Sequence, residues 1–388
     1  MYDYGPMECI DERIHHMRNK PQPDESKVNA TLSNWFGRKK AFSEQDCTTI
    51  LQQHGVNSLE FALCVDSEYT SHTSPLPQEY APTQLIEASA RSEKGGTLDF
   101  AYLIRPFLAI FRSQMNAVNL KHGKLLSDEA INNILSYLTS SLLSKSLKTF
   151  IYDMHLSKMK TPLVGATGSA RLQNYLANVG TSEGLLDFYK RYPVLYRKNA
   201  ETSKRTITYI DEMLTRLIEE RGTISAQLLH SDMAFSSITK VDLGQGDTHS
   251  GGQTVAIINT NIGKFVYKPR NISIETAYRN IVEFFSRAIG FLDLYIPKST
   301  LSSQHAFVEY IEHKTCQNET EIKQYFKRYG EIVALMYLCN GTDMHYENII
   351  AHGPYPVVID IETLFCTPIV TANPHSECNR ILRGSRPG

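Results

Sequence analysis

The sequence lacks an excess of charge of either sign. It has 388 residues, with 40 Lys and Arg against 41 Asp and Glu, which gives a formal net charge of −1. A surface balanced in this way generates no strong field for polyanions, and the sequence contains no basic tract or arginine-rich arm. Nucleic acid is therefore not an expected partner.

Long apolar runs and paired cysteines are missing as well. No uninterrupted apolar stretch approaches the roughly 18 residues that a membrane span needs, and the most apolar segment, 101–111, contains Arg105 and Pro106. The 7 cysteines are scattered without C-x-x-C spacing, and the polar N-terminus has no signal-peptide core. These absences argue against a disulfide framework or a zinc knuckle, and they predict a cytoplasmic protein with reduced thiols and no membrane span.

The hydrophobic pattern changes its period near residue 235. Residues 27–235 mostly show the three- and four-residue spacing of amphipathic helices, whereas 254–258 and 265–268 are short β-prone runs joined by a hairpin signal. A helix capped by Ser273 and closed by Gly290 is expected next, then a strand around 306–311 and a helix from about 320 to 338. This order predicts an α+β protein with three parts: a helical region 1–235, a kinase-like small lobe 236–312 and the start of a kinase-like large lobe 313–388.

The segment 342–362 carries the strongest chemical signal. Phosphoryl transfer from ATP needs a carboxylate that orients the acceptor hydroxyl, and an amide oxygen and a carboxylate that hold Mg²⁺. Asp343 precedes Asn348 by five positions, and a Gly-Pro turn between two apolar runs leads to Asp360. Each residue alone could be structural, but together they predict a catalytic Asp343 beside His345, and Mg²⁺ ligands Asn348, Asp360 and Glu362. For His345 a buried structural role, and for Glu362 a role in a turn, stay open.

Lys268 ends a predicted strand just before a helix, which is where a kinase places the amine that anchors phosphate. Glu283 is the candidate for its carboxylate partner. Glu283 also fits a surface ladder with Arg279 and Arg287, and Glu275 competes for the pairing. The segment 309–311 could be the hinge that meets adenine, or a plain strand.

Glycines at 244, 246, 251 and 252 precede the first hairpin. Glycine lets backbone amides approach phosphate, so Gly246, Gly251 and Gly252 are candidates for covering ATP. The segment is not a Walker A loop, because no Lys-Ser or Lys-Thr follows. The alternative to a phosphate-covering role is a flexible loop without a ligand. Asp247 and His249 are unusual here because an acidic group repels phosphate, so we expect them to have a further duty.

Four motifs in order resemble the dehydratase domain of class II lanthipeptide synthetases: 246–253 (GDTHSGGQ), 266–270 (VYKPR), 342–349 (TDMHYENI) and 359–365 (IDIETLF). The resemblance implies a lipid-kinase-like core that uses ATP and Mg²⁺ to phosphorylate Ser and Thr of a ribosomal precursor peptide carrying a leader. Elimination of phosphate then leaves dehydroalanine and dehydrobutyrine. It assigns to phosphorylation the residues Lys268, Asp343, His345, Asn348, Asp360 and Glu362. It assigns Asp247 and His249 to elimination, which needs acid–base groups beside the phosphoester.

Members of that family continue through the rest of the large lobe, an Arg and a Thr used in elimination, and a zinc-bearing cyclase domain. We therefore expect this chain to be a truncated dehydratase that has lost elimination, and an association with a transporter or protease complex is left open. Two other functions remain: a phosphotransferase acting on a lipid or small molecule, and a non-catalytic peptide-binding remnant. Binding of ATP with Mg²⁺ would separate the last from a kinase.

Overall fold

A computed structural model describes residues 56–65, 98–249, 252–290 and 293–365, together with single positions between 30 and 88. By its internal contacts the chain divides into two units. One comprises Met1–Leu76, Tyr189–Arg197 and Pro368–Gly388, and the other comprises Pro77–Phe188 and Lys198–Thr367. The second unit contains every predicted site residue. The divisions predicted at residues 235 and 312 fall inside it and stay predictions.

In the first unit the structure describes a short helix, α4 (Ser58–Val65), and the segment Tyr189–Arg197. The start of α4 is a capping box, in which Asn57 and Glu60 each accept the backbone N–H of the other, at 2.8 and 2.9 Å. Ala62 in this helix is buried together with Leu32.

Helices fill the described chain from residue 101 to residue 227. They are α6 (Ala101–Lys121), α7 (Asp128–Lys160), α8 (Gly168–Val179), α9 (Ser182–Arg191), α10 (Pro193–Glu219) and α11 (Arg221–Gln227). Local signals mark their starts. Ser127 accepts the N–H of Ala130 at 3.1 Å as the N-cap of α7, and Pro193 opens α10 at a position where no backbone donor is needed. Within the described residues no helix is both long and apolar enough to cross a bilayer.

An antiparallel sheet follows, with the strand order β1-β2-β3-β5-β4 among the described residues. Its strands are β1 (Ile238–His249), β2 (Gln253–Thr260), β3 (Lys264–Lys268), β4 (Ser299–Leu301) and β5 (Ala306–Glu309), and helix α12 (Ile274–Ile289) connects β3 to β4. Burial alternates along β2, as expected of a strand with one face in a core. The hairpin predicted between 254 and 268 is confirmed. Strands β1 and β4 were not predicted, and β1 runs through most of the segment that the sequence suggested to be a glycine loop.

Buried polar and aromatic contacts fasten the sheet to α10. Tyr209 donates from its hydroxyl to the carbonyl of Thr254 at 2.5 Å, and its ring lies 6.2 Å from that of Tyr267. Burial raises the pKa of the Tyr209 hydroxyl, so it remains a donor. Just after α10, Glu220 accepts from Thr300 at 3.0 Å and lies 2.6 Å from the Nε2 atom of His305. These contacts hold the sheet against α10 and Glu220. The candidate site lies at the end of β3.

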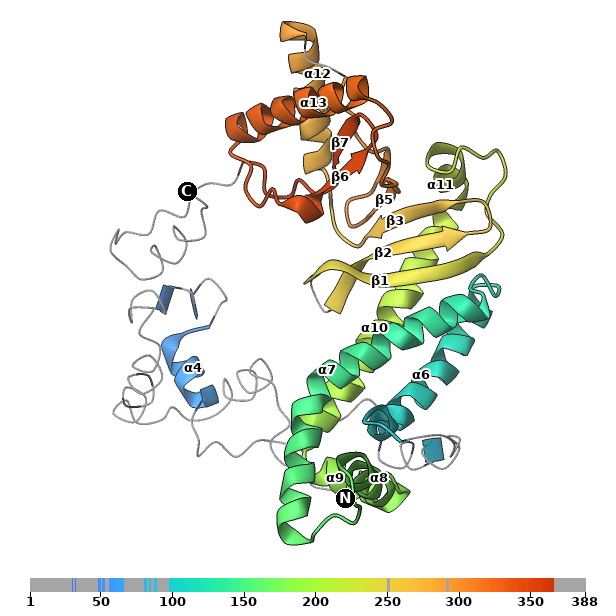
Figure 1. Ribbon diagram of the computed structural model, residues 1–388, viewed down its shortest axis with the longest axis vertical. Coiled ribbons are helices and arrows are strands. Elements are labelled where there is room, and N and C mark those ends of the chain that lie inside the picture. Colours follow the sequence, from blue (N-terminus) through green and yellow to red (C-terminus); the bar gives the residue numbers. More distant parts are fainter. Residues whose placement is uncertain are drawn as a thin grey trace. The chain divides into compact units, whose positions relative to one another are not determined.

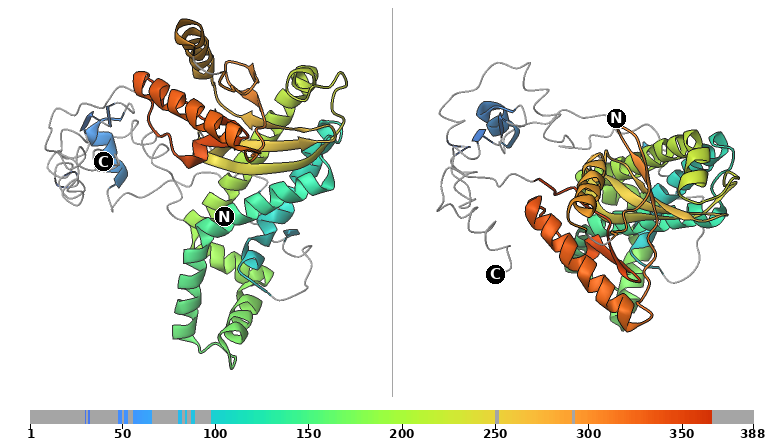
Figure 2. Two further views of the ribbon diagram at one scale, coloured as in Figure 1. Left: turned by 45° about the horizontal axis from the view of Figure 1, so that its top comes forward. Right: turned by 90° about the horizontal axis from the view of Figure 1, so that it is seen from above.

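The C-terminal elements pack on a second core. They are α13 (Glu319–Leu338), the 3₁₀ turn η3 (Tyr346–Asn348), β6 (Ile349–His352) and β7 (Tyr355–Val358). Figures 1 and 2 show α13 beside the β6–β7 hairpin. Ile332 and Leu335 of α13 are buried with Tyr278 and Val282 of α12 and with Val358 of β7. The helix predicted over 320–338 and the hairpin after it are confirmed, and the mixture of helices with antiparallel sheet confirms the α+β class.

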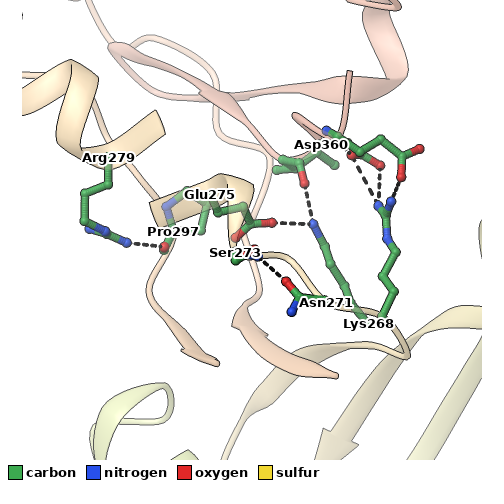
Figure 3. Close-up of polar contacts among 10 residues, drawn as sticks. Lys268, Asn271, Ser273, Glu275, Arg279, Pro297 and Asp360 are labelled. Atoms are coloured by element: carbon green, nitrogen blue, oxygen red, sulfur yellow. Dashed lines mark hydrogen bonds and ion pairs between the residues drawn. The ribbon is translucent and has the colours of Figure 1, made fainter. Parts of the chain in front are cut away.

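Helix α12 begins differently from the prediction. Ser273 is already helical, with φ −57° and ψ −22°, and its side chain makes no capping hydrogen bond to the described residues. Asn271 instead accepts the N–H of Ser273 at 2.7 Å (Figure 3). The predicted Ser273 cap is wrong because an N-cap side chain is placed correctly only by extended backbone. Gly290 closes the helix as predicted, at φ 68°.

Candidate functional site at the end of strand β3

Lys268 is the last residue of β3, and its side chain is only 7% exposed. Its ammonium donates to Glu275 Oε1 at 2.9 Å and to the carbonyl of Ile359 at 2.8 Å (Figure 3). The first contact ties the sheet to α12, and the second ties it to the segment that leads to Asp360. These two contacts use two of the three donors of the ammonium.

The predicted pairing of Lys268 with Glu283 is wrong, because Glu275 takes that place. Glu283 instead bonds Arg287 at 3.0 Å, with both side chains at least half exposed. The two glutamates are eight residues apart on α12, which is about 12 Å along a helix axis. Only the carboxylate in the first turn can therefore reach the end of β3.

Arg270 is a site residue that sequence reasoning missed. It lies two positions after Lys268, and its Nη2 atom is 3.0 Å from Asp360 Oδ2 while Nη1 pairs with the carboxylate of Glu362 (Figure 3). Its side chain is 17% exposed. The only signal in the sequence was its place in the Lys-Pro-Arg motif, since an Arg after a Pro otherwise suggests a surface turn.

The loop that contains Asp343 is held by its own backbone. Asp343 has a left-handed φ of 59°, which is uncommon for a non-glycine residue and typical of functional loops. The side-chain amide of Asn348 donates to the carbonyl of Asp343 at 2.8 Å, and the N–H of Ile359 donates to the carbonyl of Asn348 at 3.0 Å. These bonds join Asp343 to Asn348, and Asn348 to Ile359, the residue before Asp360, at the open end of the β6–β7 hairpin.

His345 belongs to the same loop and is not buried. Its side chain is 43% exposed, its Nε2 atom lies 3.7 Å from Asp343 Oδ1, and its Nδ1 atom accepts the N–H of Glu347 at 3.3 Å. The contact with Glu347 caps η3. The alternative of a histidine satisfied inside the core does not fit this exposure.

The oxygen atoms at the hairpin end suit Mg²⁺. The carbonyl of Asp343 can only accept, so the atom of Asn348 that contacts it is the amide nitrogen, and the side-chain oxygen remains as a ligand. Asp360 and Glu362 also carry oxygen atoms, the ligand type that Mg²⁺ prefers, and both carboxylates contact Arg270. No cluster of three or more His, Cys, Asp or Glu side chains suited to a metal occurs among the described residues, so any Mg²⁺ site here depends on the amide oxygen and on ligands from the nucleotide.

The glycine segment is the far end of the β1–β2 hairpin. Strand β1 continues through it to His249, with register shifts on either side of Gln245. Gly244 adopts φ 79°, and a Cβ atom there would lie 2.9 Å from the ring of Tyr137, so only glycine fits. Gly246 and Gly252 also have positive φ, at 92° and 95°. The side chains of Asp247 and His249, and all of Gly251, lie outside the described part, so their predicted roles stay predictions.

Glu309, the first residue of the possible adenine-binding hinge 309–311, is the last residue of strand β5. Its N–H donates to the carbonyl of Lys298 at 2.8 Å, and its carboxylate accepts from Tyr295 at 2.5 Å and from the N–H of Lys298 at 3.0 Å. The backbone donor of Glu309 is thus already used within the sheet, and it cannot meet adenine.

Residues 192–385, half of the chain, match the family described as "Domain of unknown function (DUF4135)". The chain belongs to this family. It is also 22% identical over 288 residues to the lacticin 481/lactococcin biosynthesis protein LcnDR2 of Lactococcus lactis subsp. lactis, a match that covers 72% of this chain and 30% of that protein. These two findings confirm the predicted relation to class II lanthipeptide synthetases.

Proposed function

We propose that the chain carries the dehydratase chemistry of a lanthipeptide synthetase: ATP- and Mg²⁺-dependent phosphorylation of Ser and Thr in a precursor peptide, followed by elimination of phosphate. One observation supports this best. A run of hydrogen bonds leads from the ammonium of Lys268 through Ile359 and Asn348 to the carbonyl of Asp343. The phosphate-anchoring cation, a metal-binding amide and the catalytic carboxylate of a kinase would thus be held as one constellation.

In this proposal the chain's own residues mainly position the reactants. Asp343 accepts the proton of the peptide hydroxyl, and His345 beside it supports that carboxylate. Lys268 binds the phosphates, and its contact with Glu275 fixes the direction of its side chain. Asn348, Asp360 and Glu362 would hold Mg²⁺, which neutralises charge on the phosphates during transfer. The sheet with α12 would form the small lobe of a lipid-kinase-like core, and α13 with the β6–β7 hairpin would begin the large lobe.

Elimination needs a different set of groups. A base removes the α-proton of the phosphorylated residue, the electron pair forms the Cα–Cβ double bond, and phosphate leaves with the former side-chain oxygen. Asp247 and His249 are the candidates for this step, on the hairpin that would cover the phosphates. The precursor peptide with its leader, a transporter or protease partner and a cytoplasmic location remain parts of the proposal.

Calorimetric titration with ATP tests the first half of this function. We expect binding with Mg²⁺ present and none when a chelator removes the metal. Lys268→Ala and Asp360→Asn should each weaken binding at least about tenfold, because each removes one charged partner from a partly buried site. Glu283→Ala is the matched control, since it removes a carboxylate from an exposed pair on α12, and it should bind ATP normally.

Unchanged ATP affinity in a folded Asp360→Asn variant would contradict the metal assignment. Absence of ATP binding in the unaltered protein would favour the non-catalytic alternative. ATP binding with phosphorylation of a lipid or small molecule, and not of the precursor peptide, would favour the other phosphotransferase.

A further inference from the structure

One guanidinium binds both carboxylates that the proposed function assigns to Mg²⁺. Arg270 contacts Asp360 at 3.0 and 3.3 Å through Nη2, and pairs with Glu362 through Nη1. The side chain of Arg270 is 17% exposed, that of Asp360 30% and that of Glu362 45%. The contact is therefore partly shielded from water, and it is stronger than an ordinary surface pair.

The backbone just before Arg270 is fixed by two residues. Lys268, two residues earlier, contacts Ile359, the residue before Asp360. Pro269 between them has a fixed φ angle. Lys268 at the end of β3 thus contacts the backbone of the short segment 359–362, and Arg270, two residues later, contacts its side chains.

The guanidinium of Arg270 occupies carboxylate oxygens that a metal would bind. A divalent cation that takes the same oxygens must displace it. The Nε atom of Arg270 is buried and has no hydrogen-bond partner among the described residues. A buried donor left unsatisfied is unfavourable. The pairing with Asp360 and Glu362 leaves the Nε–H donor of Arg270 unused, and a phosphate oxygen could accept from it.

We propose that Arg270 is an exchangeable counter-ion: it neutralises Asp360 and Glu362 when no metal is bound and gives them up when Mg²⁺ arrives. This rests on the proposed function only in taking the two carboxylates as metal ligands. It makes Arg270 a positioning residue that keeps the site closed to free divalent cations. Metal then binds well only together with nucleotide, whose phosphates accept the displaced guanidinium.

The test is a titration with Mn²⁺ in the absence of nucleotide. Binding is measured by calorimetry and by the paramagnetic signal of the free ion. Arg270→Gln should bind Mn²⁺ about tenfold more tightly than the unaltered protein, the effect of removing one competing charge-assisted contact. Arg270→Lys, which keeps the charge but cannot bridge two carboxylates, should fall between them. Arg287→Gln is the matched control, because it removes an Arg from an exposed pair with Glu283, and its Mn²⁺ affinity should not change.

Thermal unfolding gives a second readout. When neither protein has metal, Arg270→Gln should melt at a lower temperature than the unaltered protein. Added Mn²⁺ should raise the melting temperature of Arg270→Gln more than that of the unaltered protein. If the role of Arg270 were merely structural, Arg270→Gln would lower the melting temperature by the same amount with and without metal. Mn²⁺ affinity that is unchanged, reduced or undetectable in Arg270→Gln would overturn the proposal.

The double variant Arg270→Gln/Asp360→Asn separates this idea from the proposed function. If Asp360 is a metal ligand, the gain in Mn²⁺ affinity should disappear in the double variant. A gain that persists would mean that the metal binds elsewhere, which contradicts the ligand assignment and the counter-ion role together. A failure of Arg270→Gln alone, with Mg²⁺-dependent ATP binding intact, contradicts the counter-ion role only.

Discussion

The two glutamates of α12 offer a sharp test of how the site is built. Glu275→Gln keeps the shape of the side chain but removes the charge that balances the ammonium of Lys268, and the two side chains are 16% and 7% exposed. Breaking a buried ion pair costs roughly 3–5 kcal/mol. The amide oxygen of Gln and the carbonyl of Ile359 can still accept from Lys268, so we expect a loss of about 2 kcal/mol in the free energy of unfolding. Glu283→Gln alters an exposed i,i+4 pair and should cost about 0.5 kcal/mol or less.

The assay is urea-induced unfolding of both variants and of the unaltered protein, with Lys268→Met added to complete a double-mutant cycle with Glu275→Gln. A coupling energy between Lys268 and Glu275, with none between Lys268 and Glu283, is the expected result. Equal losses in the two glutamine variants would refute the reasoning, because they would mean that burial of the Lys268–Glu275 pair does not contribute to stability.

Three further outcomes follow from other parts of the structure. Arg328 donates to the carbonyls of Asp293 and Pro354, both at 2.9 Å, so Arg328→Met should lower the free energy of unfolding by about 2 kcal/mol in urea, and a loss near zero would contradict this. Burial and the neighbouring Glu309 raise the pKa of Tyr295 to about 12. Because this lies above the ordinary value of about 10, the stability that Tyr295 contributes is complete below about pH 10 and is lost as the pH rises through about 12. The stability gap between the unaltered protein and Tyr295→Phe should therefore shrink over that range, and a constant gap would be inconsistent. Phe326 and Val333 are 66% and 54% exposed on one stripe of α13, so replacing both by Lys should reduce binding of a hydrophobic dye with little change in stability, whereas unchanged dye binding would place the apolar surface elsewhere.

The elements that the sequence predicted well are those whose signals are local. Alternating burial and a turn sequence specify the β2–β3 hairpin, and a helical apolar stripe closed by Gly290 specifies α12. Strand β4 was missed because Ser299–Leu301 is too short to show a period, and it exists through its pairing with β5. Ser273 shows the limit of a capping rule, since its backbone conformation depends on how Asn271 turns the chain.

The sequence suggested several residues of the candidate site, but it missed Arg270 and did not predict the pairings. Asp343, Asn348 and Asp360 could be found because their spacing is a property of the chain itself. The choice of Glu275 over Glu283 depends on where α12 starts relative to β3, and the role of Arg270 depends on how the segment 359–362 approaches that strand. Both pairings depend on the tertiary structure and cannot be predicted from a local sequence pattern.

The central claim is that residues of this chain serve the two steps of dehydration, phosphorylation and elimination, in the protein expressed from the complete gene. The most direct measurement is the mass of the precursor peptide encoded near the gene, after incubation with ATP, Mg²⁺ and the protein expressed from its complete gene. We expect the unaltered protein to yield peptide that has lost water, Asp343→Ala to leave the peptide unmodified, and His249→Ala or Asp247→Ala to accumulate peptide that has gained phosphate. Asp343→Ala should block phosphoryl transfer, which needs positioning and metal. The His249 and Asp247 variants should block only elimination, which needs acid–base groups. Dehydrated peptide from Asp343→Ala would contradict the account, and absence of phosphorylated peptide from both Asp247→Ala and His249→Ala would return those two residues to ATP binding.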